Sequence, residues 1–235
     1  MKYNAFISYS HSEDAALAPA LEKALETFAK PTFKRRALHI FRDGNDLSVS
    51  PDLWGKIENG LSDTGHFIFL ASPASAKSHY CGKEVDYWLE HKSIDTFLLA
   101  LTEGEIHWDH EANDFDWEKT TAIPKQLSGV FKNEPLYVDF RSVKASNTLS
   151  LDNPEFKTNA VLFAATLHDK SVGDMVGEDV KQHKRTVRLR NGAIGVLSAL
   201  LIAAIALSIY AINQRNTAVL EGNKAKLVSF IANSQ

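Results

Sequence analysis

Between residues 1 and 170, short apolar runs alternate with longer segments in which apolar side chains recur every third or fourth position. Short apolar runs predict strands, and the longer pattern predicts helices with one buried face. Alternation of the two is typical of a parallel sheet that is covered by helices. The pattern therefore predicts an α/β domain in this part of the chain.

Five apolar runs are expected to form the strands of the sheet: residues 3–9, 38–42, 66–71, 95–101 and 136–140. The third run is almost wholly apolar and stops at Ser72-Pro73, so it is expected to be a central strand. A helix over residues 153–168 is expected to close the fold. Five parallel strands joined by helices predict a flavodoxin-like arrangement.

Capping residues and prolines indicate where the helices begin. An apolar stripe runs through residues 17–28, and Pro19 within it is tolerated only in a first turn, so regular helix is expected from near Ala15. Ser50 is a candidate N-cap, and Pro51 would then occupy the first position of the next helix.

One later helix carries an acid one turn after an aromatic ring. Tyr80 and Glu84 lie four residues apart and share a helix face, whereas Val85 and Trp88 are expected to face the sheet. This arrangement places Glu84 beside the core and not within it. Ligands of open parallel sheets bind at the carboxyl ends of the strands, where the loops after the first two strands converge. Glu84 is therefore expected to face that crevice.

Residues 192–212 contain no charged side chain and are rich in Leu, Ile, Ala and Val. A helix of this length crosses about 30 Å of hydrocarbon, so the stretch predicts a single transmembrane helix. A buried core helix is the alternative, but such a helix would show polar positions every third or fourth residue, and only two serines interrupt this one. Lysine and arginine are concentrated before the stretch, which by the positive-inside rule keeps the α/β domain in the cytoplasm.

Composition limits the classes of partner. The chain has 26 basic and 29 acidic residues, and the run Lys34-Arg35-Arg36 is short. Nucleic-acid binding needs a concentrated basic face, so no nucleic-acid partner is expected. The one cysteine, Cys81, cannot form an intramolecular disulfide, which fits a reducing compartment.

Three segments resemble the sequence boxes of Toll/interleukin receptor (TIR) domains and occur in the family's order: Tyr3-Asn4-Ala5-Phe6-Ile7-Ser8-Tyr9-Ser10, Phe41-Arg42-Asp43 and Ser78-His79-Tyr80-Cys81-Gly82-Lys83-Glu84. The resemblance covers residues 1–168 and implies the TIR fold. The chain further resembles bacterial TIR proteins that continue through a membrane helix, which implies a bacterial inner membrane. The expected organisation is a TIR domain (1–168), a basic juxtamembrane linker (169–191), a transmembrane helix (192–212) and a short tail (213–235) that is a candidate connection to a further domain.

Catalytic members of this family cleave NAD⁺ at its nicotinamide–ribose bond, and the resemblance implies that Glu84 is their catalytic glutamate. A carboxylate suits this chemistry because loss of nicotinamide leaves positive charge on the ribose. NAD⁺ is then the substrate, and no cofactor or metal is expected. The resemblance also implies nucleotide contacts from Ser8, Tyr9, Ser10, Arg42, Asp43 and Tyr80, of which Tyr80 replaces the family's usual tryptophan.

Some of these residues have other interpretations. Glu84 is also compatible with an ordinary surface acid of a helix. Cys81 with His79 suggests a thiol nucleophile, but residues two apart on a helix point in different directions. The acids and histidines at residues 107–111 suggest a metal site, but their spacing matches no standard ligand pattern, and a solvated turn is expected instead.

Two functions follow from the resemblance. The first is a membrane-anchored NAD⁺ glycohydrolase that gives ADP-ribose or a cyclic product and acts as an antiphage or immune effector after oligomerisation. The alternative is a non-enzymatic scaffold that acts through TIR–TIR contacts. The family also suggests that the loop over residues 43–50 of one subunit completes a neighbour's site. The expected partners are NAD⁺, further copies of the chain, membrane lipid and an upstream sensor protein.

Overall fold

The computed structural model describes residues 1–31, 34–42, 51–146 and 148–232. The chain divides into two compact units, Met1–Gln182 and His183–Gln235. The first unit contains the α/β domain. The described part of the second unit is the continuation of one long helix.

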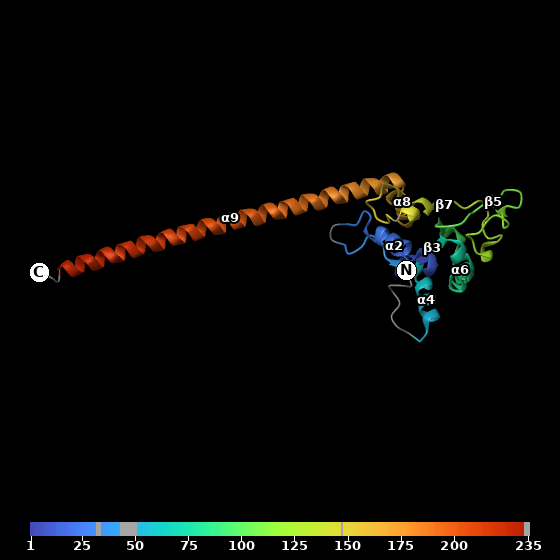
Figure 1. Ribbon diagram of the computed structural model, residues 1–235, viewed down its shortest axis with the longest axis horizontal. Coiled ribbons are helices and arrows are strands. Elements are labelled where there is room, and N and C mark those ends of the chain that lie inside the picture. The colour runs from blue at the N-terminus through green and yellow to red at the C-terminus, as the bar shows by residue number, and fades with distance from the viewer. Residues whose placement is uncertain (32–33, 43–50, 147, 233–235) are drawn as a thin grey trace. The chain divides into compact units, whose positions relative to one another are not determined.

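Strands and helices alternate along the first unit, as the apolar pattern predicts (Figure 1). In chain order the elements are β1 (Tyr3–Ser8), α1 (His11–Asp14), α2 (Leu17–Thr27), β2 (Ile40–Phe41), α4 (Leu53–Ser62), β3 (Thr64–Ala71), α5 (Pro73–Lys77), α6 (His79–His91), η1 (Ile94–Thr96), β4 (Phe97–Leu101), β5 (Trp108–Asp109), β6 (Asp114–Phe115), η2 (Lys125–Leu127), β7 (Tyr137–Asp139), α7 (Arg141–Ser146), α8 (Pro154–Leu167) and α9 (Val172–Ala232).

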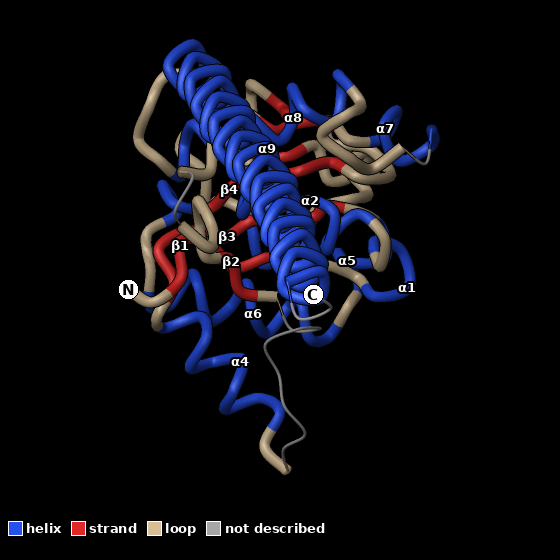
Figure 2. The backbone as a smooth tube through the Cα atoms, turned by 90° about the vertical axis from the view of Figure 1, so that its left-hand side faces the viewer, coloured by secondary structure: helices blue, strands red, loops and turns tan. Residues whose placement is uncertain are grey.

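The central sheet has five parallel strands in the order β2-β1-β3-β4-β7. The register between the two most extensively paired strands runs from Tyr3 opposite Thr64 to Ser8 opposite Phe69. Counted along the sheet, this is the strand order 2-1-3-4-5 of flavodoxin-like folds. The predicted fold class is therefore confirmed, and Figure 2 shows the strands in red through the middle of the domain.

Both faces of the sheet are buried. Successive side chains of a strand point to opposite faces, so Ile68 and Leu70 of β3 pack with α2 and α8. Phe67 and Phe69 of the same strand pack with α4 and α6 on the other face. Figure 1 shows these two helix pairs on opposite sides of the sheet. Burial on both faces explains why the strand segments are almost continuously apolar.

Two helix starts differ by a few residues from the prediction: α1 begins at His11, before Ala15, and α4 begins at Leu53, after Pro51. The first helical segment divides into α1 and α2, and Pro19 lies in the first turn of α2, where its missing N–H costs little. The next helix, α4, begins at Leu53 because Asp52 is its N-cap. The Asp52 side chain accepts a hydrogen bond from the backbone N of Gly55 at 2.9 Å.

The first turns of α9 belong to the α/β unit. Met175 is fully buried in the core beside α8. The Asp179 carboxylate lies 2.8 Å from Nζ of Lys157 on α8. Further along, α9 contains the one described helix that is long and apolar enough to cross a membrane, and none of its apolar window is buried within the chain.

Candidate active site

The candidate site lies where β1 ends and α6 begins. β1 ends at Ser8, and the backbone of this residue is fixed in the sheet opposite Phe69 of β3. α6 begins after Ser78, whose side chain caps the helix by accepting a hydrogen bond from the backbone N of Cys81. A strand end and the first turns of a helix are rigid supports for a functional side chain.

Glu84 lies inside the protein and not beside the core. Its side chain is only 4% exposed, and Ser8 is 1% exposed. Ser8 Oγ donates a hydrogen bond to Glu84 Oε2 at 2.6 Å. This distance is typical of a hydroxyl that donates to an ionised carboxylate. The prediction that the acid lies outside the core was therefore wrong.

The reason for this burial can be found in the sequence. Cys81, Glu84, Val85 and Trp88 all lie on the buried face of α6. Their spacing of three, four and seven residues is that of a single helical stripe. The prediction grouped Glu84 with Tyr80, four residues earlier, although Glu84 also lies on the buried stripe with Cys81 and Val85.

A second side-chain hydrogen bond joins the same two elements. Cys81 Sγ donates to the backbone O of Tyr9 at 3.3 Å, one helical turn before Glu84. The thiol is buried and points at a carbonyl, as expected of a packing residue. The last residue of β1 and the residue after it are thus held against α6 at two points.

Tyr9 and Arg42 belong to one buried network. Arg42 Nε lies 2.6 Å from Glu22 Oε2, and its NH1 donates to the Tyr9 hydroxyl at 3.1 Å. Burial alone would lower the pKa of Arg42, but the hydrogen bonds to Glu22 and Tyr9 outweigh it and raise that pKa. The structure thus brings Arg42 to the carboxyl end of β1. Asp43, the next predicted site residue, lies outside the described residues.

Ser10 and Tyr80 occupy different surroundings. Ser10 is buried at the start of α1, where its carbonyl accepts from the backbone N of Asp14 at 2.8 Å and its hydroxyl lies 2.9 Å from that of Ser12. Tyr80 is 50% exposed, and its ring centroid lies 5.8 Å from that of His79. Tyr80 is therefore the most exposed described member of the predicted site.

A further charged cluster lies at the same edge of the sheet, and the sequence did not predict it. Asp14 is fully buried, and Lys144 Nζ lies 3.1 Å from its Oδ1 and 2.8 Å from Glu13 Oε1. Burial raises the pKa of Asp14, and Lys144 opposes this shift. The cluster joins α1 to α7, which are about 130 residues apart in sequence, so no local pattern could have revealed it.

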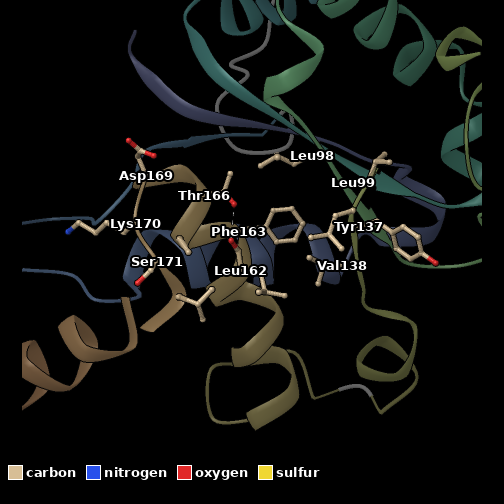
Figure 3. A pocket seen from close by; sticks show the side chains of 13 residues that line it. Leu98, Leu99, Tyr137, Val138, Leu162, Phe163, Thr166, Asp169, Lys170 and Ser171 are labelled. Carbon is tan, nitrogen blue, oxygen red and sulfur yellow. Dashed lines mark hydrogen bonds between the residues drawn. The ribbon is translucent and has the colours of Figure 1, made fainter. Parts of the chain in front are cut away.

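A cavity of ≈ 730 Å³ lies elsewhere in the domain, between β4, β7, α8 and the start of α9. Its lining is mainly apolar, and Figure 3 shows Leu98, Val138 and Phe163 around it. None of the predicted site residues lines it. Residues 107–111 lie around β5 and its turn, and in the described part of the chain no three His, Cys, Asp or Glu side chains form a group that could hold a metal ion.

Comparison with known proteins places these residues in a family. Residues 5–127, just over half of the chain, match the family described as TIR domain. The chain belongs to the TIR-domain family. The TIR match includes Ser8, Arg42 and Glu84, so the strand end, the arginine network and the buried acid all lie within the matched region.

Two individual proteins are similar to this TIR chain. The protein named NAD(+) hydrolase ApTIR, from Actinoplanes sp., is 42% identical over 202 residues. That match covers 86% of the chain but 28% of the relative, so the chain spans less than a third of the relative's length. The crystal structure of the TIR domain of the Toll-related receptor TRR-2 from Hydra magnipapillata matches 69% of the chain and 98% of that structure, with 16% identity and a TM-score of 0.41.

Proposed function

We propose that this TIR chain is an NAD⁺ glycohydrolase in which Glu84 promotes cleavage of the nicotinamide–ribose bond. The observation that carries the proposal is the buried Glu84 carboxylate, which a 2.6 Å hydrogen bond from Ser8 fixes at the carboxyl edge of a parallel sheet. Ligands of open α/β sheets bind at this edge. The 42% identity to a protein named NAD(+) hydrolase supports the same activity.

The chemistry needs one carboxylate. Nicotinamide departs with the electron pair of the C1′–N bond and leaves as a neutral molecule, so no acid has to protonate it. Positive charge then develops on the ribose, and a preorganised carboxylate in a water-poor site stabilises that charge. Water adds to C1′ and loses a proton to give ADP-ribose, whereas attack by an adenine nitrogen of the same molecule gives a cyclic product.

The other proposed site residues have secondary roles. The half-exposed ring of Tyr80, one turn before Glu84, offers a surface on which nicotinamide can stack. Arg42 holds the Tyr9 hydroxyl at the end of β1 and so shapes the nucleotide side of the site. The nucleotide contacts proposed for Ser10 and Asp43 rest on the family resemblance alone.

In this proposal, one transmembrane segment of α9 anchors the chain, and the TIR domain lies in the cytoplasm. The exposed apolar stretch of α9 supports the anchor, and the basic residues before it support the orientation.

The proposed biological role is that of an immune effector against phage. An upstream sensor would activate it by assembling copies of the chain. A non-enzymatic scaffold is the function that remains if catalysis is absent.

The proposal can be tested with the full chain in detergent and in lipid vesicles. Release of nicotinamide from NAD⁺ is measured by chromatography, and mass spectrometry identifies the second product. Glu84→Gln is expected to abolish nicotinamide release. The matched control is Glu90→Gln, which neutralises an exposed acid of the same helix and is expected to retain full activity. Absence of nicotinamide release from the wild type in every assembled state would favour the scaffold.

A further inference from the structure

The hydroxyl of Ser8 is committed to Glu84. Ser8 is 1% exposed, and its single hydroxyl hydrogen is donated to Glu84 Oε2 at 2.6 Å. A serine that contacts a nucleotide has to present its hydroxyl to the ligand. The observed burial and hydrogen bond instead direct this hydroxyl at the acid.

We infer that Ser8 is a positioning residue. It holds the Glu84 carboxylate in place to stabilise the charge that develops on the ribose of NAD⁺, and it does not itself contact the nucleotide. The inference rests on the proposed function. It also differs from the nucleotide contact that the family resemblance implies for Ser8.

Ser8 and Glu84 differ in conformational freedom, and this difference lets the hydrogen bond position the Glu84 carboxylate. Ser8 is the last residue of β1 and is held in register with Phe69 of β3, so its Oγ has a nearly fixed position. Glu84 has three side-chain torsions, and holding it in one rotamer costs conformational entropy. A hydrogen-bond donor on a rigid strand fixes the Glu84 rotamer during folding, so this entropy is not lost again when the substrate binds. Such preorganisation is required of a group that stabilises charge in a transition state.

The hydrogen bond also offsets the cost of burial. An ionised carboxylate that is removed from water is strongly destabilised unless polar partners compensate. The distance between Ser8 Oγ and Glu84 Oε2 lies in the range of charge-assisted hydrogen bonds. Ser8 therefore supplies a polar partner to the buried carboxylate.

The nearby bond between Cys81 and Tyr9 provides an internal comparison. It joins the same strand end to the same helix one turn earlier, at 3.3 Å, but it does not involve the acid. If Ser8 only tied β1 to α6, loss of the Cys81 bond would have a similar effect on catalysis. If Ser8 acts through Glu84, the two losses have different effects.

The experiment compares Ser8→Ala with Cys81→Ala in the full chain. Hydrogen bonds to charged groups are worth enough that kcat for nicotinamide release should fall about ten- to hundredfold in Ser8→Ala, with KM for NAD⁺ unchanged. Cys81→Ala should keep kcat within about threefold of the wild type, since neutral hydrogen bonds contribute less.

A second experiment measures binding. In a Glu84→Gln background, adding Ser8→Ala should leave the dissociation constant of NAD⁺ unchanged. An increase in that constant would show that Ser8 contacts the nucleotide, and equal losses of kcat in the two single variants would show a merely structural tie. Either result overturns the inference.

A readout without catalysis separates failure of this inference from failure of the proposed function. The ¹³C resonance of the Glu84 side-chain carboxyl, assigned by its disappearance in Glu84→Gln, should shift in Ser8→Ala and stay in place in Cys81→Ala. An unmoved resonance in Ser8→Ala would overturn the inference even in an active enzyme. If the resonance shifts in Ser8→Ala but the wild-type chain releases no nicotinamide, the hydrogen bond between Ser8 and Glu84 is supported and the proposed function is contradicted.

Discussion

At the scale of single residues, two buried carboxylates in this domain are compensated in different ways. Glu84 receives a hydrogen bond from the hydroxyl of Ser8, which is a neutral donor. Asp14 faces the ammonium group of Lys144, which it shares with the carboxylates of Glu13 and Glu103. Neither Asp14 oxygen makes a hydrogen bond of ordinary geometry with the described residues, so the ion pair is its main compensation. A carboxylate that accepts from a neutral hydroxyl fits a group that stabilises a cation, whereas the ion pair at Asp14 fits a structural role.

We expect Lys144→Met to lower the free energy of unfolding at neutral pH by about 2–3 kcal/mol, because it leaves a buried carboxylate without its counter-charge. The loss should shrink at acid pH. Burial raises the pKa of Asp14 above its unfolded value, so as the pH falls through the folded pKa, Asp14 takes up a proton and the variant is relieved of the buried charge. The wild type meanwhile loses the attraction between Lys144 and the carboxylates. Urea unfolding at about pH 7 and about pH 4.5 measures both free energies.

The control for this prediction is Lys119→Met, which removes the exposed ion pair with Asp116. Exposed pairs contribute about 0–1 kcal/mol, so this variant should remain close to the wild type at both pH values. An equally large loss for Lys144→Met at neutral and acid pH would argue against a buried, ionised Asp14.

Some properties of single residues could be predicted from the sequence, and others depend on the tertiary fold. The burial of Glu84 could have been predicted, because residues 81, 84, 85 and 88 form one stripe of α6. The partners of Asp14 could not, since only the tertiary fold brings Lys144 to α1. Because both Ser8 and Glu84 were predicted at the carboxyl edge of the sheet, the sequence could place them near each other. It could not predict that the Ser8 hydroxyl donates a hydrogen bond to the Glu84 carboxylate.

At the scale of elements, the five strands of the central sheet could be predicted from apolar runs, and the β5–β6 hairpin could not. β3 is apolar throughout its second half because helices cover both of its faces. The strands of the β5–β6 hairpin have two residues each, which is too short for any period to be recognised. Helix starts shifted by a few residues because several neighbouring side chains can act as caps, and only the local geometry selects one.

We expect Gly60→Ala in α4 to destabilise the domain. A Cβ at this position would lie 2.7 Å from Phe41 Cζ. The Phe41 ring belongs to β2 and packs against Tyr3 and Phe6 of β1, so it cannot move aside without disturbing the sheet. Overpacking of this kind costs about 1–3 kcal/mol. The control is Gly177→Ala in α9, where a Cβ would meet nothing within 4 Å and helix propensity favours alanine by about 1 kcal/mol. Thermal unfolding of both variants is the measurement, and a neutral Gly60→Ala would contradict the packing described for α4.

At the scale of the whole molecule, the proposed function depends on copies of the chain meeting one another in a membrane. Confinement to a plane raises the effective concentration of the subunits without any new contact. The sequence predicts an apolar stretch, and its residues in α9 are exposed along the helix. A single chain contains no information on how many copies assemble, because that number depends on surfaces of several molecules at once.

We expect the turnover per chain to fall when the chains are diluted within the membrane. Protein is reconstituted at rising ratios of lipid to protein, and nicotinamide release is measured at a fixed total concentration of chain and of NAD⁺. Adding empty vesicles after reconstitution is the matched control, because it adds lipid without separating the chains, and it should leave turnover unchanged. Turnover that is independent of the lipid ratio would contradict activation by assembly.

The central claim is that the Glu84 carboxylate stabilises the charge that develops on the ribose and is not needed to bind NAD⁺. The most direct measurement determines kcat and the dissociation constant of NAD⁺ side by side for the wild type and for Glu84→Gln, which keeps the size of the side chain and removes its charge. Loss of one electrostatic group of this kind costs about a hundredfold to a thousandfold in kcat. The account predicts a loss of at least this size with a dissociation constant that changes by less than about threefold. A Glu84→Gln enzyme that retains turnover, or that loses turnover only because it no longer binds NAD⁺, would contradict it.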